Sequence, residues 1–141
     1  FNFVLKFFSL RKTKKKKIDF LIYYRKHKNK SSLFQYGLIK KLTSIGLKIN
    51  VVGDELNLNG VKNHGYKSNK IINNLQSKSR FTIASKESIY SFFTLECLSN
   101  NMRIIIDPKE EKRINFLKKE FIFIDFNQIK TLSDYKKFIR S

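Results

Sequence analysis

Cysteine, proline and acidic side chains are all scarce in this chain of 141 residues. The single cysteine, Cys97, cannot form an intrachain disulfide, which excludes a disulfide-stabilised scaffold and favours a reducing, cytoplasmic setting. Cys97 also lies among apolar neighbours, so we expect a buried structural thiol. One proline and five glycines are too few for a long flexible linker, and no run approaches the roughly 20 apolar residues that span a bilayer.

Negative charge is the largest shortage, since 11 Asp and Glu face 30 Lys and Arg, for a net charge of +19. Such a field attracts polyanions, which include nucleic acid, an anionic membrane surface and phosphorylated substrates. Lys, Ile, Asn and Phe are abundant together, as an AT-rich gene produces whatever the function, so charge alone does not choose among them. Hydrophobic residues make up 41% of the chain, enough for one domain with its own core.

The first 17 residues differ from the rest of the chain. A short apolar stretch precedes Arg11 to Lys17, which holds six basic residues in seven. We interpret residues 1–17 as a basic connector from a missing upstream region, with an interfacial amphipathic piece or the tail of an anchor as the alternatives. Residues 18–141 are expected to form one domain.

Apolar runs alternate with amphipathic segments through this domain. Strands are predicted at 18–24, 48–52, 61–66, 81–84, 102–106 and 121–126, and helices at 31–45, 69–78, from about 91, at 110–119 and from 128. On the helix 69–78, Ser68 is the expected N-cap, and Ile71, Ile72 and Leu75 are expected to point inward. This alternation predicts a doubly wound, Rossmann-like α/β domain: a parallel sheet with helices on both faces in three αβα layers.

Ligands of such sheets bind beyond the carboxyl ends of the strands, where we expect the loops at 25–30, 54–60, 66–68 and 86–91 to form one rim. A helix that begins near Ser91 exposes unpaired backbone N–H groups, which favour anions such as a diphosphate. We therefore predict contacts from Ser91, Phe92 and Phe93. Carboxylates beside such a site suit sugar hydroxyls; the candidates are Glu96 in the helix and Glu87 before it, with Ser88 as an alternative polar contact to Glu87.

Basic residues are predicted to stabilise a departing diphosphate, because fixed cations offset the charge that develops on it. Arg25 and Lys30, in the loop after the first strand, are the candidates, and a merely solvated basic loop is the alternative. Glu96 likewise has the alternative of a solvent-exposed helix glutamate. The two histidines show no metal-ligand spacing, and no Asp-x-Asp motif is present.

Three segments together resemble the C-terminal, nucleotide-sugar-binding half of GT-B glycosyltransferases of the Glu-x7-Glu retaining group. They are DFLIYYRKHKNK, NHGYKSNKIINNLQSKSRFTIAS and ESIYSFFTLECLSNNMRIII. The third is similar to the Glu-x7-Glu segment, with Glu96 as its second acidic position. Ser88 stands at the first acidic position, and Glu87 lies one residue earlier.

The resemblance implies a donor domain that binds a nucleoside diphosphate sugar, with the acceptor held by a missing N-terminal domain. It implies that Glu96 accepts hydrogen bonds from the donor ribose and that Tyr66 and Lys67 border the nucleobase. Arg25 and Lys30 would be the catalytic cations, no metal or other cofactor would be required, and this chain alone would bind donor without turnover.

Two other functions stay open on the sequence. The positive charge fits a nucleic-acid-binding module, although no helix-turn-helix or RNA-binding strand motif is present. The chain could also be a degenerate, non-catalytic glycosyltransferase remnant, because the family's glycine-rich turn is replaced here by Ser88 to Ser91. A peripheral contact with the inner face of an anionic membrane is compatible with the glycosyltransferase prediction.

Overall fold

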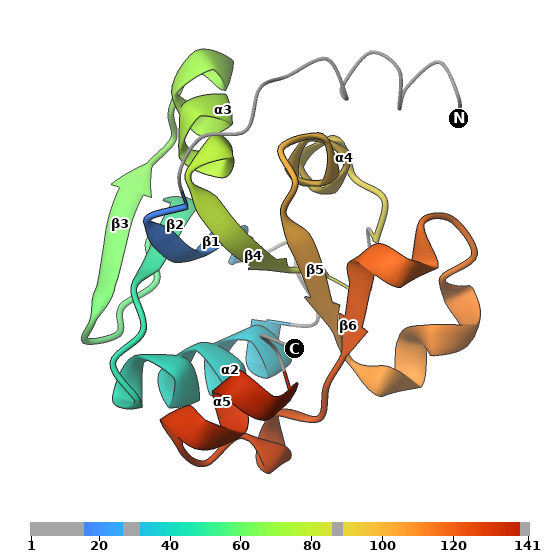
Figure 1. Cartoon of the computed structure of the whole chain (residues 1–141). Coiled ribbons are helices and arrows are strands. Elements are labelled where there is room, and N and C mark those ends of the chain that lie inside the picture. Colours follow the sequence, from blue (N-terminus) through green and yellow to red (C-terminus); the bar gives the residue numbers. More distant parts are fainter. Residues whose placement is uncertain (1–15, 27–31, 86–88, 139–141) are drawn as a thin grey trace.

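The computed structural model describes residues 16–26, 32–85 and 89–138 (Figure 1). Within these ranges six parallel strands form one sheet in the order β3-β2-β1-β4-β5-β6. The strands are β1 (Ile18–Tyr24), β2 (Ile49–Gly53), β3 (Val61–Gly65), β4 (Ser79–Ile83), β5 (Arg103–Ile106) and β6 (Phe121–Phe123). The α-helices are α2 (Ser32–Ser44), α3 (Asn69–Ser77), α4 (Phe92–Ser99) and α5 (Leu132–Phe138). The predicted Rossmann-like α/β class is therefore confirmed.

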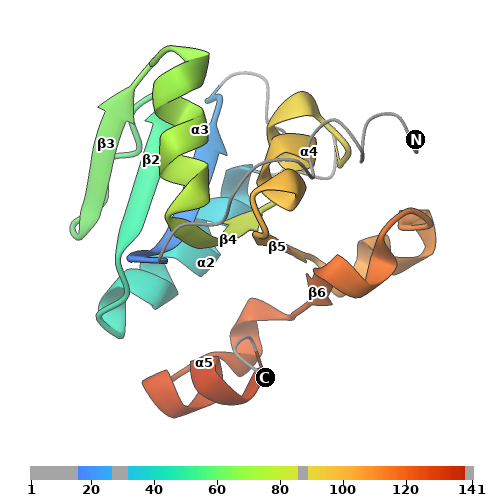
Figure 2. The ribbon, with the colours of Figure 1, turned by 45° about the horizontal axis from the view of Figure 1, so that its top comes forward.

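The sheet separates two hydrophobic cores. Along β1, Phe20, Ile22 and Tyr24 belong to one core, while Leu21 and Tyr23 belong to the other, because alternate side chains of a strand point to opposite faces. Figures 1 and 2 show α2 and α5 on one side of the sheet and α3 and α4 on the other. The α2/α5 core includes Leu38, Ile39, Leu42, Ile105 and Tyr135, and the α3/α4 core includes Ala84, Cys97, Ile104 and Ile106.

Local capping fixes where α3 begins, as predicted: the Ser68 hydroxyl accepts a hydrogen bond from the Ile71 backbone N–H at 3.4 Å. Ile72 and Leu75 pack against the α3/α4 core. The prediction for Ile71 was wrong, because its side chain is 47% exposed. The first three residues of α3 are exposed, and the buried residues of the helix, Gln76 and Ser77, lie in its last turn.

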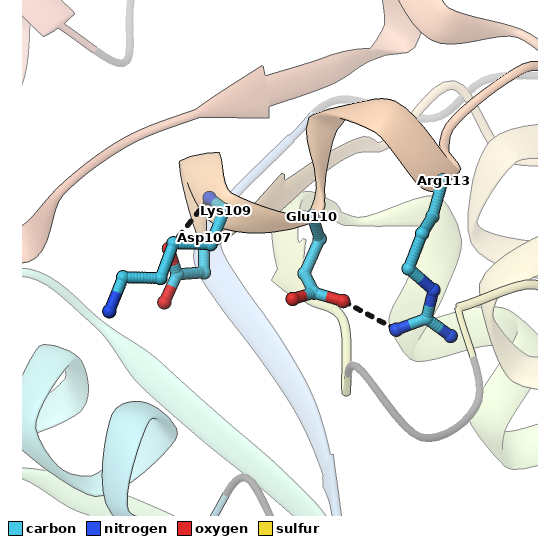
Figure 3. A network of polar contacts seen from close by, with 4 residues as sticks. All are labelled: Asp107, Lys109, Glu110 and Arg113. Atoms are coloured by element: carbon cyan, nitrogen blue, oxygen red, sulfur yellow. Dashed lines mark hydrogen bonds and ion pairs between the residues drawn. The ribbon is translucent and has the colours of Figure 1, made fainter.

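The α-helix predicted at 110–119 is absent from the structure. The chain instead forms two 3₁₀ segments, η1 (Pro108–Arg113) and η2 (Lys118–Glu120). The Asp107 carboxylate accepts the Lys109 N–H at 3.0 Å, and Glu110 pairs with Arg113 (Figure 3). An i,i+3 pair suits a 3₁₀ turn, in which residues three apart lie one above the other. Leu117 then adopts a left-handed backbone with φ of 56°, which interrupts any continuing helix.

The C-terminal elements are shorter than predicted. The strand expected at 121–126 ends at Phe123, since Asp125 caps a 3₁₀ turn, η3 (Phe126–Gln128), through the Asn127 N–H at 3.0 Å. The final helix begins at Leu132 and not at 128. The Thr131 hydroxyl accepts the Asp134 N–H and the Asp134 carboxylate accepts the Thr131 N–H, a reciprocal cap that sets this start.

No helix in the described ranges has the length and apolar character required to cross a membrane.

Candidate functional site

The strand order places the point of topological reversal between β1 and β4. From β1 the chain builds outward through β2 to β3, then returns across the sheet to β4. Because all strands are parallel, the residues that follow them share one edge, here called the carboxyl edge. Ligands of open α/β sheets bind at this edge near the reversal. In the described residues it carries Arg25 and Lys26 after β1, Asp54 after β2, Tyr66 and Lys67 after β3, and Ser91 before α4.

Three residues from three strand ends contact one another at the carboxyl edge. The Arg25 guanidinium lies 5.8 Å from the centroid of the Tyr66 ring, within cation–π range. The Tyr66 hydroxyl donates to Asp54 Oδ1 at 2.7 Å, and this bond raises the pKa of Tyr66. Asp54 Oδ2 accepts the Lys26 backbone N–H at 2.9 Å. The structure thus brings together Arg25 and Tyr66, both predicted site residues, through a carboxylate that the sequence analysis did not single out.

A glycine positions this carboxylate. Gly53 ends β2 with φ of +96°, and a Cβ at this position would lie 2.5 Å from the Tyr24 carbonyl oxygen. Only glycine fits such a close approach with a positive φ. The turn it permits lets the Asp54 N–H donate to the Tyr24 carbonyl at 2.8 Å, which fixes the carboxylate over the end of β1. The Gly53-Asp54 step at a strand end was the sequence signal for this residue.

Arg25 is also connected to the start of α4. Arg25 Nη1 donates to the Tyr23 hydroxyl at 3.3 Å, a bond that raises the pKa of Arg25. The Tyr23 ring packs against Phe93 with 5.3 Å between ring centroids. Phe93 is the second residue of α4, so the chain of contacts crosses the reversal from β1 to the helix that follows β4. Tyr23 was missed by sequence reasoning, because its role depends on a contact between elements distant in the chain.

The start of α4 has the geometry predicted for it. Ser91 is the N-cap, and its hydroxyl accepts the Thr94 N–H at 3.2 Å. Helix geometry leaves the N–H groups of Phe92 and Phe93 without intrahelical acceptors. Phe92 itself is 79% exposed.

Of the remaining predicted site residues, Glu96 and Lys67 belong to the part of the chain that the structure describes. Glu96 lies five residues after Ser91 on α4, about 7.5 Å along the helix axis, and is half-buried. Lys67 is exposed beside Tyr66. Lys30, Glu87 and Ser88 lie outside the described residues.

A depression of about 470 Å³ opens beside Asp54, lined by Lys26, Asp54, Glu55 and Asn57. Its lining carries both signs of charge and an amide, and Lys26, Glu55 and Asn57 are exposed. Its volume falls within the range of small-molecule sites. It lies at the β1 and β2 ends of the carboxyl edge, and its lining residue Asp54 also accepts the hydrogen bond from the Tyr66 hydroxyl.

Metal binding has no support from the described residues, among which no group of three or more His, Cys, Asp or Glu side chains is placed to hold an ion. His64 on β3 instead pairs with Asn50 Oδ1 at 2.6 Å. Partial burial, with the charges of Lys62 and Lys67, lowers the pKa of His64.

No protein-family model matches this sequence, and no curated protein matches it significantly. The class of protein therefore has to be argued from the fold and the carboxyl edge.

Proposed function

We propose that this domain binds a nucleoside diphosphate sugar at the carboxyl edge and acts as the donor domain of a glycosyltransferase. The supporting observation is the series of contacts that joins Tyr66, Arg25, Tyr23 and Phe93. It sets an aromatic ring, a cation and a helix start in sequence along one edge of the sheet. A nucleoside diphosphate presents groups that suit these three, a flat base for the ring and a polyanion for the cation and the helix start.

In this proposal the diphosphate lies between Arg25 and the first turn of α4. Breaking the bond between the sugar's anomeric carbon and the diphosphate oxygen leaves negative charge on the diphosphate. Arg25 and the N–H groups of Phe92 and Phe93 would stabilise that charge without a metal ion. Lys30, Glu87 and Ser88 remain proposed contacts of the phosphate and the transferred sugar.

The base and the ribose take the remaining predicted roles. Tyr66 and Lys67 border the base, and Glu96 accepts hydrogen bonds from the ribose hydroxyls. The acceptor hydroxyl, and the base that removes its proton, would come from another domain, so this chain binds donor without turning it over. A cytoplasmic location, with contact to the inner membrane face, belongs to the same proposal.

The lysines of the described residues do not form the single basic face that duplex binding would favour. A duplex-binding protein concentrates its cations on one face. Here exposed lysines occur on opposite faces of the sheet, for example Lys40 on α2 and Lys70 on α3. Others lie on the η1 and η2 segments, at the far end of the strand order from β3.

Calorimetry with UDP, GDP and ADP tests the proposal. At least one diphosphate should bind more tightly than its nucleoside or the free sugar, because most contacts go to the phosphates. Arg25→Gln should weaken the binding about ten- to a hundredfold, as expected for a lost charge-assisted contact. The matched control is Arg103→Gln, at the amino end of β5, which should leave affinity unchanged. Flat titrations with all three diphosphates would refute the proposal.

Glu96→Gln separates a ribose contact from a structural role, because it keeps the shape of the side chain and removes its charge. Nucleotide affinity should fall about tenfold or more while the fold is retained. A loss of stability at unchanged affinity would make Glu96 structural.

A further inference from the structure

We propose that the depression lined by Lys26, Asp54, Glu55 and Asn57 recognises the base of the nucleotide and selects guanine. This inference rests on the proposed function and extends it to the identity of the donor base. It is carried by the hydrogen bond from Tyr66 to Asp54, a lining residue of the depression, and by the chemistry of the other lining residues.

The Tyr66 ring offers a surface on which a base can stack. Its side chain is 61% exposed although its hydroxyl is fixed on Asp54 and its ring lies near the Arg25 guanidinium. Both contacts hold the ring in one orientation, and the exposed fraction leaves room for a planar ligand. Stacking of a base on an aromatic ring is favourable for every base, so Tyr66 supplies affinity and not choice.

Discrimination among the bases must come from the polar groups of the depression. Both oxygens of Asp54 already accept hydrogen bonds, from the Tyr66 hydroxyl and the Lys26 N–H. Asp54 therefore acts as a support that aligns the lining. The exposed carboxylate of Glu55 and the exposed ammonium of Lys26 are the charged groups left to meet a ligand.

Guanine fits this pair of charges better than the other bases. Its N1–H and N2–H₂ groups lie side by side and can donate together to one carboxylate, which accepts two parallel bonds. Its O6 and N7 atoms are acceptors suited to a lysine ammonium. Adenine offers N6–H₂ beside an acceptor nitrogen, and uracil has a single N–H between two carbonyls. In both bases an acceptor atom would therefore lie against the Glu55 carboxylate, which is itself an acceptor.

The test is a comparison of GDP, ADP and UDP binding to the full chain and to Glu55→Gln, by calorimetry at one ionic strength. GDP should bind the unaltered chain about tenfold more tightly than UDP, with ADP between them. Glu55→Gln should lower GDP affinity about tenfold and leave UDP affinity within about twofold. Glu111→Gln, which removes the same charge from an exposed position on η1, should leave all three affinities unchanged. Thermal melting checks that both variants remain folded.

Three results would overturn the inference while leaving the proposed function intact. UDP or ADP could bind as tightly as GDP, Glu55→Gln could lower all three affinities equally, or it could leave a GDP preference unchanged. Absence of binding by every diphosphate is a different result, because it removes the proposed function itself.

Discussion

The two faces of the sheet are filled in different ways. On the α2/α5 face the core is apolar, and the rings of Phe20, Phe81 and Tyr135 lie 5.5 to 6.4 Å from one another between centroids. On the α3/α4 face buried amides bond across the helix pair. Asn100 Nδ2 donates to Gln76 Oε1 at 3.2 Å, and Gln76 Nε2 donates to the Phe93 carbonyl at 3.4 Å. Apolar side chains pack on both faces, and the α3/α4 face adds directional bonds between buried amides.

The difference matters for the candidate site, because α4, whose start belongs to that site, packs on the α3/α4 face. Lys16 Nζ donates to the Asn100 carbonyl at 2.6 Å, which adds a further hydrogen bond at the C-terminal end of α4. Satisfied buried polar networks specify one arrangement of their elements, whereas apolar contacts tolerate small shifts. We infer that the α2/α5 face supplies most of the stability and that the α3/α4 network sets the position of Ser91 and Phe93.

The largest expected effect is a loss of stability when a core side chain of the α2/α5 face is truncated. Phe20→Ala should lower the free energy of unfolding by about 3–5 kcal/mol, because Phe20 is fully buried among other rings. Denaturant unfolding measures the change. Phe92→Ala, at an exposed aromatic position, is the control and should change stability by less than about 0.5 kcal/mol. Similar small changes for both variants would contradict the assignment of stability to this face.

A smaller loss of stability, together with weaker nucleotide binding, is expected when the amide network of the α3/α4 face is broken. Gln76→Leu should cost about 1–3 kcal/mol, since the Asn100 amide loses an acceptor and the Phe93 carbonyl loses a donor. Nucleotide affinity should also fall severalfold, because the start of α4 is no longer fixed. Gln128→Leu, at an exposed position on η3, should change neither quantity. A destabilised Gln76 variant with unchanged affinity would show that the network does not position the site.

The effect that is smallest near neutral pH, and grows only as pH rises, concerns the buried thiol of the α3/α4 face. Complete burial raises the pKa of Cys97 well above its ordinary value. The unfolded chain therefore loses this proton first, and the thiol's contribution to stability is present below the unfolded pKa and lost as pH rises above it. The loss is about 1.4 kcal/mol per pH unit above about pH 8.5.

The comparison with Cys97→Ala isolates this contribution. Lys16, whose pKa burial lowers, acts in the opposite direction but is present in both proteins. Unfolding free energies measured at pH 8, 9 and 10 should decline more for the unaltered chain. Parallel curves, or rapid reaction of the native thiol with a thiol reagent, would mean that Cys97 is accessible.

The sequence predicted those features that depend on neighbouring residues. The nearly continuous apolar run of β1 and the serine caps of α3 and α4 are local signals, and all three lie where predicted. The contact between Asp54 and Tyr66 was not predictable in this way, because it joins the ends of two strands. The Gln76–Asn100 bond likewise spans 24 residues. The 3₁₀ turns escaped prediction since apolar residues in 110–119 suggested a helical stripe that Asp107 and Leu117 override locally.

The most direct test of nucleotide binding at the carboxyl edge is the salt dependence of affinity for GDP and for a generic DNA duplex, between about 50 and 200 mM salt. A diphosphate that contacts few cations and a helix start should lose affinity only gently, whereas each neutralised phosphate of a duplex releases counterions and steepens the decline. We expect measurable GDP binding across this range, and duplex binding that is weak and vanishes near physiological salt. Tight, sequence-selective duplex binding that survives at physiological salt, with flat GDP titrations, would contradict the nucleotide-sugar proposal.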